Sequence, residues 1–135
     1  MMDTDLGGSI TVPADVQSVL DAYAAGFDDF DAEAVAECFA YPATLWQGGR
    51  GNVFDDEEDL IENVEALLDI FEREEIVHST FRIEDAAFGQ DSGAALLSWR
   101  QERADGEAAL EFTCRYLFIR DGEDGAWRIA TTVTD

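Results

Sequence analysis

Apolar residues recur at helical spacing in the first half of this chain and alternate with polar residues in the second half. The first helix is expected to begin near residues 11–13, because proline suits the first turn of a helix. Asp31 is placed to cap a short second helix that includes Phe39 and ends at Tyr41–Pro42. One apolar face of the first helix is formed by Val16, Val19, Leu20, Tyr23 and Phe27.

A glycine-centred hairpin and a long helix are predicted next. Residues 43–54 carry the glycines of a tight turn between two short strands. Asp55 followed by Glu58 is typical of a helix start, and this helix is expected to run to about Glu74. Its apolar stripe is Leu60, Ile61, Val64, Leu67, Leu68 and Phe71.

Four strand-like segments follow, at about residues 76–88, 94–103, 108–120 and 126–134, separated by turns rich in glycine and aspartate. The order of helix, helix, hairpin, long helix and four-stranded meander predicts an α+β fold. In such a fold the helices gather on one face of an antiparallel sheet. Residues 11–135 are long enough for one domain, and residues 1–10 are interpreted as a loose N-terminal arm.

Alternation along each strand predicts which side chains face the helices. Leu117 and Ile119 fall on the opposite, outer face and leave apolar surface there, which suits a homodimer contact. His78 also falls on the outer face. The inward set is Val77, Ser79, Phe81, Ile83, Leu97, Trp99, Gln101, Leu110, Phe112, Cys114, Tyr116, Phe118, Trp127, Ile129, Thr131 and Val133.

The charge balance changes the picture of the surface. The chain has 31 acidic residues and 8 basic ones, all arginine, with a net charge of -23, yet 47% of it is hydrophobic. Such a chain can bury enough apolar surface to fold, so it is interpreted as a domain with an acidic coat. Salt relieves the self-repulsion of such a coat, and we expect a salt-rich cytoplasm, as in halophilic archaea.

The same composition excludes several classes of partner. Eight arginines among 31 acids do not form the basic patch that nucleic acid or an anionic membrane requires. The acidic N-terminus lacks the basic region of a signal peptide, and no apolar run approaches membrane-span length, so a cytoplasmic location is expected. Cys38 and Cys114 are then expected to be buried, reduced thiols.

Three stretches of the chain resemble a known superfamily. They are residues 23–39 with the following Tyr41-Pro42-Ala43-Thr44-Leu45, the region from His78 to Ala95, and Asp124-Gly125-Ala126-Trp127-Arg128-Ile129. In this order they resemble the nuclear transport factor 2-like proteins, and among them the SnoaL-like proteins related to polyketide cyclases and ketosteroid isomerases. The resemblance covers residues 11–135. It implies a cone-shaped, cystatin-like fold in which a curved sheet wraps the long helix and encloses an apolar pocket, with homodimers packed sheet to sheet.

The predicted pocket contains many rings and few ionisable groups. A small, largely apolar or aromatic molecule is the expected ligand. The predicted ligand-binding residues are Tyr23, Phe39, Trp46, Phe81, Trp99, Phe112, Tyr116, Trp127 and Thr131.

The candidate catalytic residues are Tyr23 and His78. The resemblance implies that the related isomerases use a buried carboxylate near the first hairpin, where this chain has Leu45, Trp46, Gln47 and Gly48. Tyr23 matches the tyrosine on the first helix of those isomerases, although a tyrosine there also suits an ordinary core. His78 is the only histidine, and it is either a general base or a residue of the outer face.

No metal and no built-in cofactor are expected. The acidic run 55–59 lacks the alternating ligands of a calcium loop and suits a helix N-terminus. Residues 48–51 carry neither nucleotide-binding fingerprint. Three functional hypotheses remain: a small-molecule pocket protein, a cyclase, isomerase or dehydratase that uses Tyr23 with or without His78, and a dimerising module whose cone is filled by its own side chains.

Overall fold

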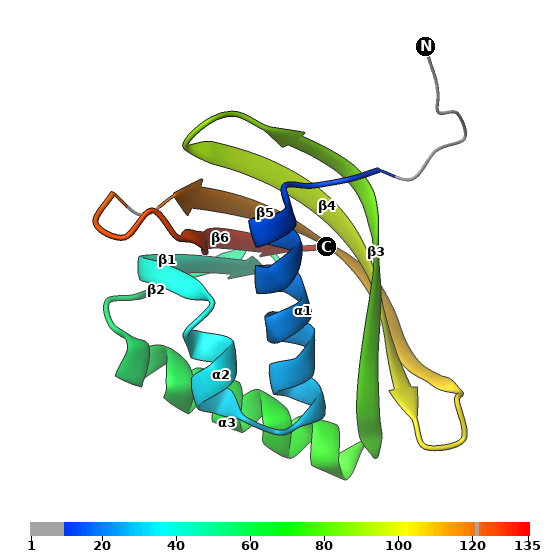
Figure 1. The fold of residues 1–135 in the computed structure, drawn as a ribbon. Helices are drawn as coiled ribbons and strands as arrows, with labels where there is room; N and C mark the ends of the chain where they lie inside the picture. Colours follow the sequence, from blue (N-terminus) through cyan, green and yellow to red (C-terminus); the bar gives the residue numbers. More distant parts are fainter. Residues whose placement is uncertain (1–9, 121) are drawn as a thin grey trace.

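The computed structural model describes residues 10–120 and 122–135, so residues 1–9 of the predicted N-terminal arm lie outside the described part of the chain. Three helices gather on the concave side of one curved sheet (Figure 1). The α+β class and the order of elements predicted from the sequence are confirmed. The elements are α1 (Ala14–Asp28), α2 (Ala32–Ala36), β1 (Phe39–Gln47), β2 (Arg50–Phe54), α3 (Glu57–Arg73), β3 (Ile76–Phe88), β4 (Ser92–Arg103), β5 (Ala108–Arg120) and β6 (Trp127–Thr134).

The sheet is mixed rather than antiparallel throughout, which corrects the expectation from the sequence. Its strand order is β2-β1-β6-β5-β4-β3, and β1 pairs with β6 in parallel while every other neighbouring pair is antiparallel. The hairpin of β1 and β2 adds to the free edge of β6, so the last strand of the chain becomes central. Residues from the hairpin therefore lie beside residues from the end of the meander.

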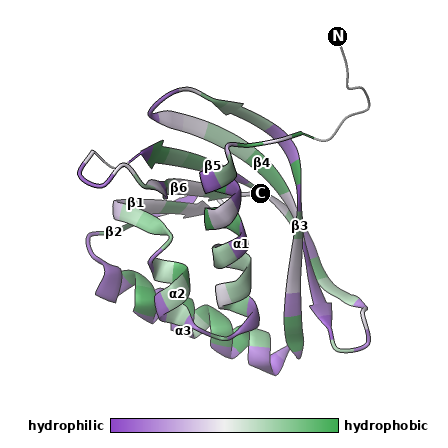
Figure 2. Ribbon diagram, in the orientation of Figure 1, coloured by the Kyte–Doolittle hydropathy of each residue, from purple (hydrophilic) through white to green (hydrophobic). Residues whose placement is uncertain are grey.

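The helices bury most of the apolar faces predicted for them, although Leu67 of α3 is 37% exposed. Val16 and Leu20 of α1 are fully buried, and α1 packs against β3 and β6. Bands of hydrophobic and hydrophilic residues alternate along α3, which covers β2 and β3 with its apolar stripe (Figure 2). The cap of α3 is Asp56, whose carboxylate accepts the Asp59 N–H at 2.9 Å, one residue later than expected.

The second helix is shorter than predicted. Asp31 caps it by accepting the Ala34 N–H at 3.1 Å, as expected, but the helix ends at Ala36. Phe39 lies in β1, because the chain there leaves the helix to pair with β6: the Ile129 N–H donates to the carbonyl of Cys38 at 2.8 Å. The cis Tyr41–Pro42 bond therefore lies inside a strand.

Two irregularities change which side chains face the helices. In β6, Ala130 has no register partner, because Phe118 pairs with Ile129 and Leu117 with Thr131. An extra residue of this kind reverses the alternation beyond it. Thr131 and Val133 therefore face outward, against the prediction. In β3 a similar shift after Ile76 buries Ile76 and exposes Val77, which had been expected to face inward.

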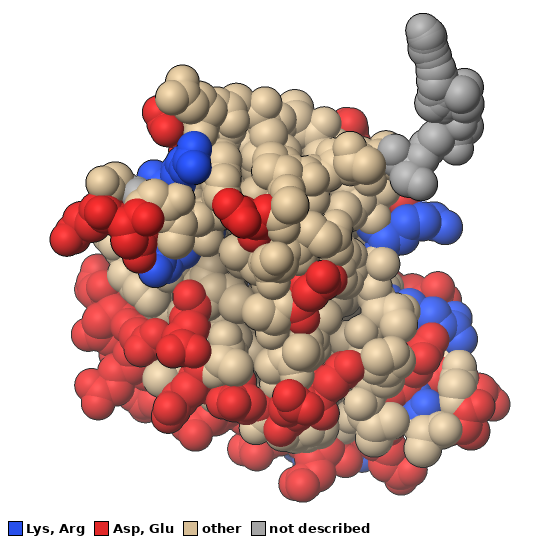
Figure 3. All heavy atoms as spheres, viewed as in Figure 1, with Lys and Arg blue, Asp and Glu red and all other residues tan. Residues whose placement is uncertain are grey.

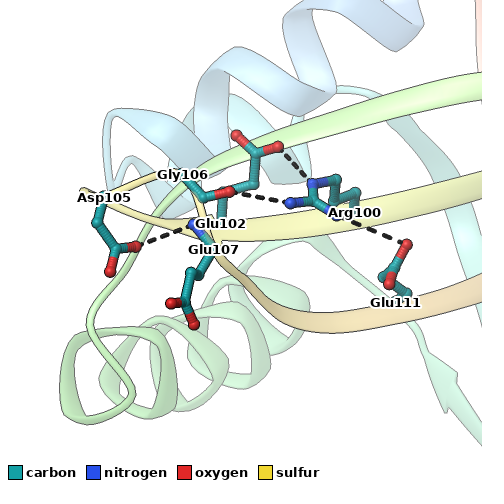
Figure 4. Close-up of polar contacts among 6 residues, drawn as sticks. All are labelled: Arg100, Glu102, Asp105, Gly106, Glu107 and Glu111. Atoms are coloured by element: carbon teal, nitrogen blue, oxygen red, sulfur yellow. Dashed lines mark hydrogen bonds and ion pairs between the residues drawn. The ribbon is translucent and has the colours of Figure 1, made fainter.

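Acidic side chains crowd the lower part of the surface, over α2 and α3, and the arginines visible in this view lie toward its two sides with acidic side chains next to them (Figure 3). Arg100 illustrates the pattern at the β4–β5 turn (Figure 4). Its Nε donates to the Glu102 carboxylate at 2.7 Å, one Nη donates to the Gly106 carbonyl at 2.9 Å, and the other lies 3.8 Å from the Glu111 carboxylate. The guanidinium fork thus serves several acceptors at once, which a lysine cannot do in the same geometry.

Among the residues that the structure describes, none of the helices combines the length and the apolar character that a membrane crossing needs.

Candidate functional site

A cavity of about 320 Å³ lies between the concave face of the sheet and the helices α1 and α3. Apolar and aromatic side chains form most of its wall. The lining residues are Tyr23, Phe27, Leu45, Trp46, Gln47, Asn52, Phe54, Asn63, Leu67, Phe71, Trp99, Gln101, Leu110, Phe112, Cys114, Tyr116, Thr132, Thr134 and Asp135.

Three rings form the closed side of the cavity. The Trp99 Nε1–H donates to the Tyr116 hydroxyl at 2.9 Å, and both side chains are buried. The Tyr23 ring, which comes from α1, lies edge-on to both, with centroid distances of 5.8 Å to Trp99 and 5.9 Å to Tyr116. Edge-to-face contacts of this kind are favourable and fix the rings relative to one another.

The two tyrosine hydroxyls of this cluster remain protonated over the physiological range. Burial raises the pKa of Tyr23 well above its ordinary value, and the neighbouring Cys114 raises it further, against an opposing effect of the hydrogen bond with Tyr116. Burial also raises the pKa of Tyr116, with a contribution from Tyr23. Both groups can therefore act as neutral hydrogen-bonding groups but not as bases at neutral pH.

Small neutral polar groups lie on the sheet side of the cavity. Thr132 and Thr134 of β6 face inward because of the extra residue Ala130, and the Thr134 hydroxyl lies 3.4 Å from the Cys114 sulfur. Gln101 of β4 is only 6% exposed, and its Oε1 has no hydrogen-bond partner. A buried carboxamide oxygen without a partner is rare in proteins and costly.

The rim carries carboxamides and one carboxylate. Gln47 and Asn52 come from the β1–β2 hairpin and Asn63 comes from α3. Asp135 accepts hydrogen bonds from Arg115 at 2.6 Å and from Thr113 at 3.1 Å, and the bond to Arg115 holds its pKa below its ordinary value. This carboxylate is therefore ionised and engaged, which makes it a weak candidate for a general base.

The structure brings together five of the predicted ligand-binding residues around the cavity, with Trp46 at its rim: Tyr23, Trp46, Trp99, Phe112 and Tyr116. Phe39, Phe81, Trp127 and Thr131 do not line it. Phe39 packs on Tyr23 from behind, with ring centroids 5.9 Å apart, and Phe81 packs on Trp99. Trp127 packs against Phe88 at the other end of the sheet, and Thr131 is turned outward by the irregularity in β6.

Several lining residues were not among the predicted ligand-binding residues. Asn63, Leu67 and Phe71 lie four residues apart on α3, so helical spacing alone could have identified them as one wall. Gln47 and Asn52 flank the glycine turn of the hairpin, where nothing in the sequence pattern indicates that the turn closes over a cavity. Thr132 and Thr134 fall outside the inward set predicted from alternation, because an extra residue in a strand has no clear signature in the sequence.

His78 does not line the cavity. It lies on β3, where its Nδ1 is 2.6 Å from one carboxylate oxygen of Asp28, at the end of α1. The other oxygen of Asp28 accepts the Ser79 N–H at 2.8 Å, so this carboxylate ties the end of α1 to β3. A joint role of His78 and Tyr23 in proton transfer has no geometric support here.

The described residues include no cluster of three or more histidine, cysteine or acidic side chains arranged to hold a metal ion. Burial raises the pKa of the Cys38 thiol to about 11, and it also raises that of Cys114. Thiols of this kind are poor nucleophiles near neutral pH, because the thiolate is the reactive form.

A curved mixed sheet closed by three helices over a cavity is the architecture of the nuclear transport factor 2-like proteins. The chain belongs to the family described as NTF2-like protein (DUF6841), whose model matches residues 14–135. No curated protein matches the sequence.

Solved structures agree on the fold. An NTF-2 like protein of unknown function from Shewanella oneidensis is similar with a TM-score of 0.70 and 14% identity over 89% of this chain and 95% of that one. A domain of unknown function with a cystatin-like fold from Nostoc punctiforme has a TM-score of 0.74 and 13% identity, covering 92% and 78%. A ketosteroid isomerase-like protein from Erwinia carotovora has a TM-score of 0.67 and 20% identity, covering 90% and 92%. At these identities the likeness concerns the fold alone.

Proposed function

We propose that this protein binds a small, largely apolar molecule in the cavity between the sheet and the helices α1 and α3. The observation that carries the proposal is the cavity itself: about 320 Å³, lined by rings, with a few neutral polar groups. A concave apolar site with a small number of polar groups is the usual form of a small-molecule site. The same volume argues against a cone filled by its own side chains.

The enzymatic alternative has less support. Proton abstraction needs a base within hydrogen-bond reach of the substrate. Among the described residues that line the cavity, Asp135 is the only carboxylate, and it is held by Arg115. Tyr23 is a neutral donor, which suits orientation of a bound molecule better than removal of a proton.

A thermal-shift screen in molar potassium chloride tests the proposal with steroid-like, polyketide-like and small aromatic compounds. A compound at about 100 times its Kd stabilises the native state by about 2.7 kcal/mol and raises the Tm. Thr132→Phe, which fills the cavity, should abolish the shift, and Thr131→Phe on the outer face of the same strand is the matched control. Near-ultraviolet circular dichroism checks that both variants fold. A flat screen, or a shift that survives in Thr132→Phe, contradicts the proposal.

We also propose that two copies associate through the outer face of the sheet. Leu117 and Val133 are 46% and 37% exposed there, and Val53 on edge strand β2 is 64% exposed. The nearby carboxylate of Asp135 is paired with Arg115. Two chains of charge -23 repel each other, so self-association needs a face where acids are scarce or paired, and this face meets that condition.

Light scattering on a sizing column tests the association. Leu117→Glu should convert a dimer into a monomer, whereas Val77→Glu, an exposed apolar position on edge strand β3, should leave the mass unchanged. A wild-type protein that elutes as a monomer at high concentration in molar salt would contradict this proposal and leave the cavity proposal intact.

A further inference from the structure

The side chain of Gln101 is the most unusual polar group in the wall of the cavity. It points from β4 to the concave face, with Trp99 two residues before it on the same strand and Leu110 opposite it on β5. Its Oε1 is enclosed and has no hydrogen-bond partner. Ser79, its register partner on β3, also has a buried hydroxyl without a partner. Two unsatisfied polar groups thus lie side by side on the sheet, and of the two only Gln101 lines the cavity.

A carboxamide has one end that accepts hydrogen bonds and one end that donates them. Whichever way the amide of Gln101 is turned, a group beside it is best satisfied if it can both accept and donate. A hydroxyl or an amide meets this condition. An ether can only accept, and a carboxylate presents its negative oxygens to the accepting end.

The other residues that line the cavity indicate that the bound group is neutral. No arginine, lysine or histidine occurs among the described residues that line the cavity. The tyrosine hydroxyls stay protonated, so they supply no charge of their own. An anion would lose its hydration without a counter-charge, which is strongly unfavourable.

We infer that the ligand carries a neutral group that both donates and accepts hydrogen bonds, a hydroxyl or an amide, and that Gln101 selects it. This inference rests on the proposed cavity function. The apolar rings would bind the body of the molecule, while the carboxamide would discriminate among molecules of the same shape. A site with a buried polar group rejects an analogue that leaves the group unpaired, because the group then keeps its desolvation cost.

Three probes of one shape test the inference: 2-naphthol, 2-methoxynaphthalene and 2-naphthoate, titrated against tryptophan fluorescence in molar potassium chloride. We expect 2-naphthol to bind about tenfold more tightly than the methyl ether, which corresponds to one hydrogen bond, and 2-naphthoate to bind more weakly than both. Equal binding of 2-naphthol and its ether would overturn the inference while the cavity function stands. If none of the three binds and the compound screen is also flat, the cavity function itself fails.

Substitutions test whether Gln101 causes the preference for 2-naphthol over its methyl ether. Gln101→Met keeps the length of the side chain and removes the amide, so the preference for 2-naphthol over its ether should fall to about twofold or less. Ser79→Ala removes the neighbouring hydroxyl and should leave the preference unchanged. Gln101→Leu repeats the test if the methionine variant folds poorly. A preference that persists in the Gln101 variants, or that is lost in Ser79→Ala alone, contradicts the role of Gln101.

Discussion

The concave face of the sheet has a packed end and a hollow end, both rich in aromatic residues. At the packed end, Phe88 contacts Phe118 and Trp127 with ring centroids 5.6 Å apart, and Ile129 is fully buried beside them. At the hollow end, the same strands β5 and β6 present Cys114, Thr132 and Thr134. The rings at the two ends are comparable, so the cavity arises where short side chains stand opposite large ones. The number of aromatic residues in a segment of the sequence therefore does not predict where a pocket lies.

The largest expected effect concerns salt, because α3 closes the hollow end. Between Glu57 and Arg73 this helix carries seven acidic residues and one arginine. At low ionic strength their repulsion is unscreened, and we expect the near-ultraviolet circular dichroism of the three tryptophans to be lost. Hydrogen exchange should accelerate in α3 before it does in β4 and β5. A dichroism signal that survives dilution into low salt would show that the acidic coat does not make folding salt-dependent.

Truncation of one apolar side chain at each end separates the two ends directly. Phe118 is fully buried at the packed end, and Phe118→Ala should lower the free energy of unfolding by about 3–5 kcal/mol. Leu110 lines the cavity and is 50% exposed, so Leu110→Ala should cost about 1 kcal/mol. Urea denaturation in molar potassium chloride measures both. Similar losses for the two variants would mean that the hollow end is packed as tightly as the other.

Alkaline pH should weaken the fold through buried thiol and phenol groups. Burial raises the pKa of Cys38 to about 11, and its thiol donates to backbone carbonyls of Val19 and Ala34. Because the folded state favours the protonated thiol, this stabilisation is complete below the pKa of the unfolded chain and is lost as the pH rises through 11.

The loss attributable to Cys38 is expected to be about 3 kcal/mol, from the rise of its pKa from 9.0 to about 11. Urea denaturation of the wild type and Cys38→Ala from neutral to alkaline pH measures it as a difference in slope. Deprotonation of the buried Tyr23 and Tyr116 also destabilises the fold at alkaline pH, but this contribution is present in the wild type and in Cys38→Ala alike. Parallel curves for the two proteins would contradict the role of the thiol.

A modest effect is expected from the loss of one hydrogen bond at the hollow end. Tyr116→Phe removes the acceptor of the Trp99 Nε1–H and should cost about 1–2 kcal/mol in the free energy of unfolding. Tyr23→Phe, on the opposite side of the same cluster, removes a hydroxyl that does not bond to Trp99 and should cost less. Chemical denaturation of both variants decides the order. The reverse order would mean that the Tyr23 hydroxyl holds the cluster together.

Much of the fold was predictable from the sequence because helical and strand periodicities follow from burial of one face. The limits of β3 and β5, the cap at Asp31 and the inward position of Gln101 were all expected. The parallel pairing of β1 with β6 was not, because local pattern carries no information on which distant strand a hairpin joins. The inward positions predicted for Thr131 and Val77 are wrong for another reason: one extra residue in a strand shifts the alternation of the side chains around it.

The extra residue at Ala130 also has a consequence for how this site could change over time. A regular strand that kept Ala130 as a paired residue would turn Thr131 and Val133 inward in place of Thr132 and Thr134. Loss of the bulge would thus exchange part of a hydroxyl-bearing wall for a more apolar one without any change in the lining residues themselves. Substitutions that favour or disfavour the bulge at Ala130 are therefore a route to new ligand preferences that substitutions of the lining residues would reach only in several steps.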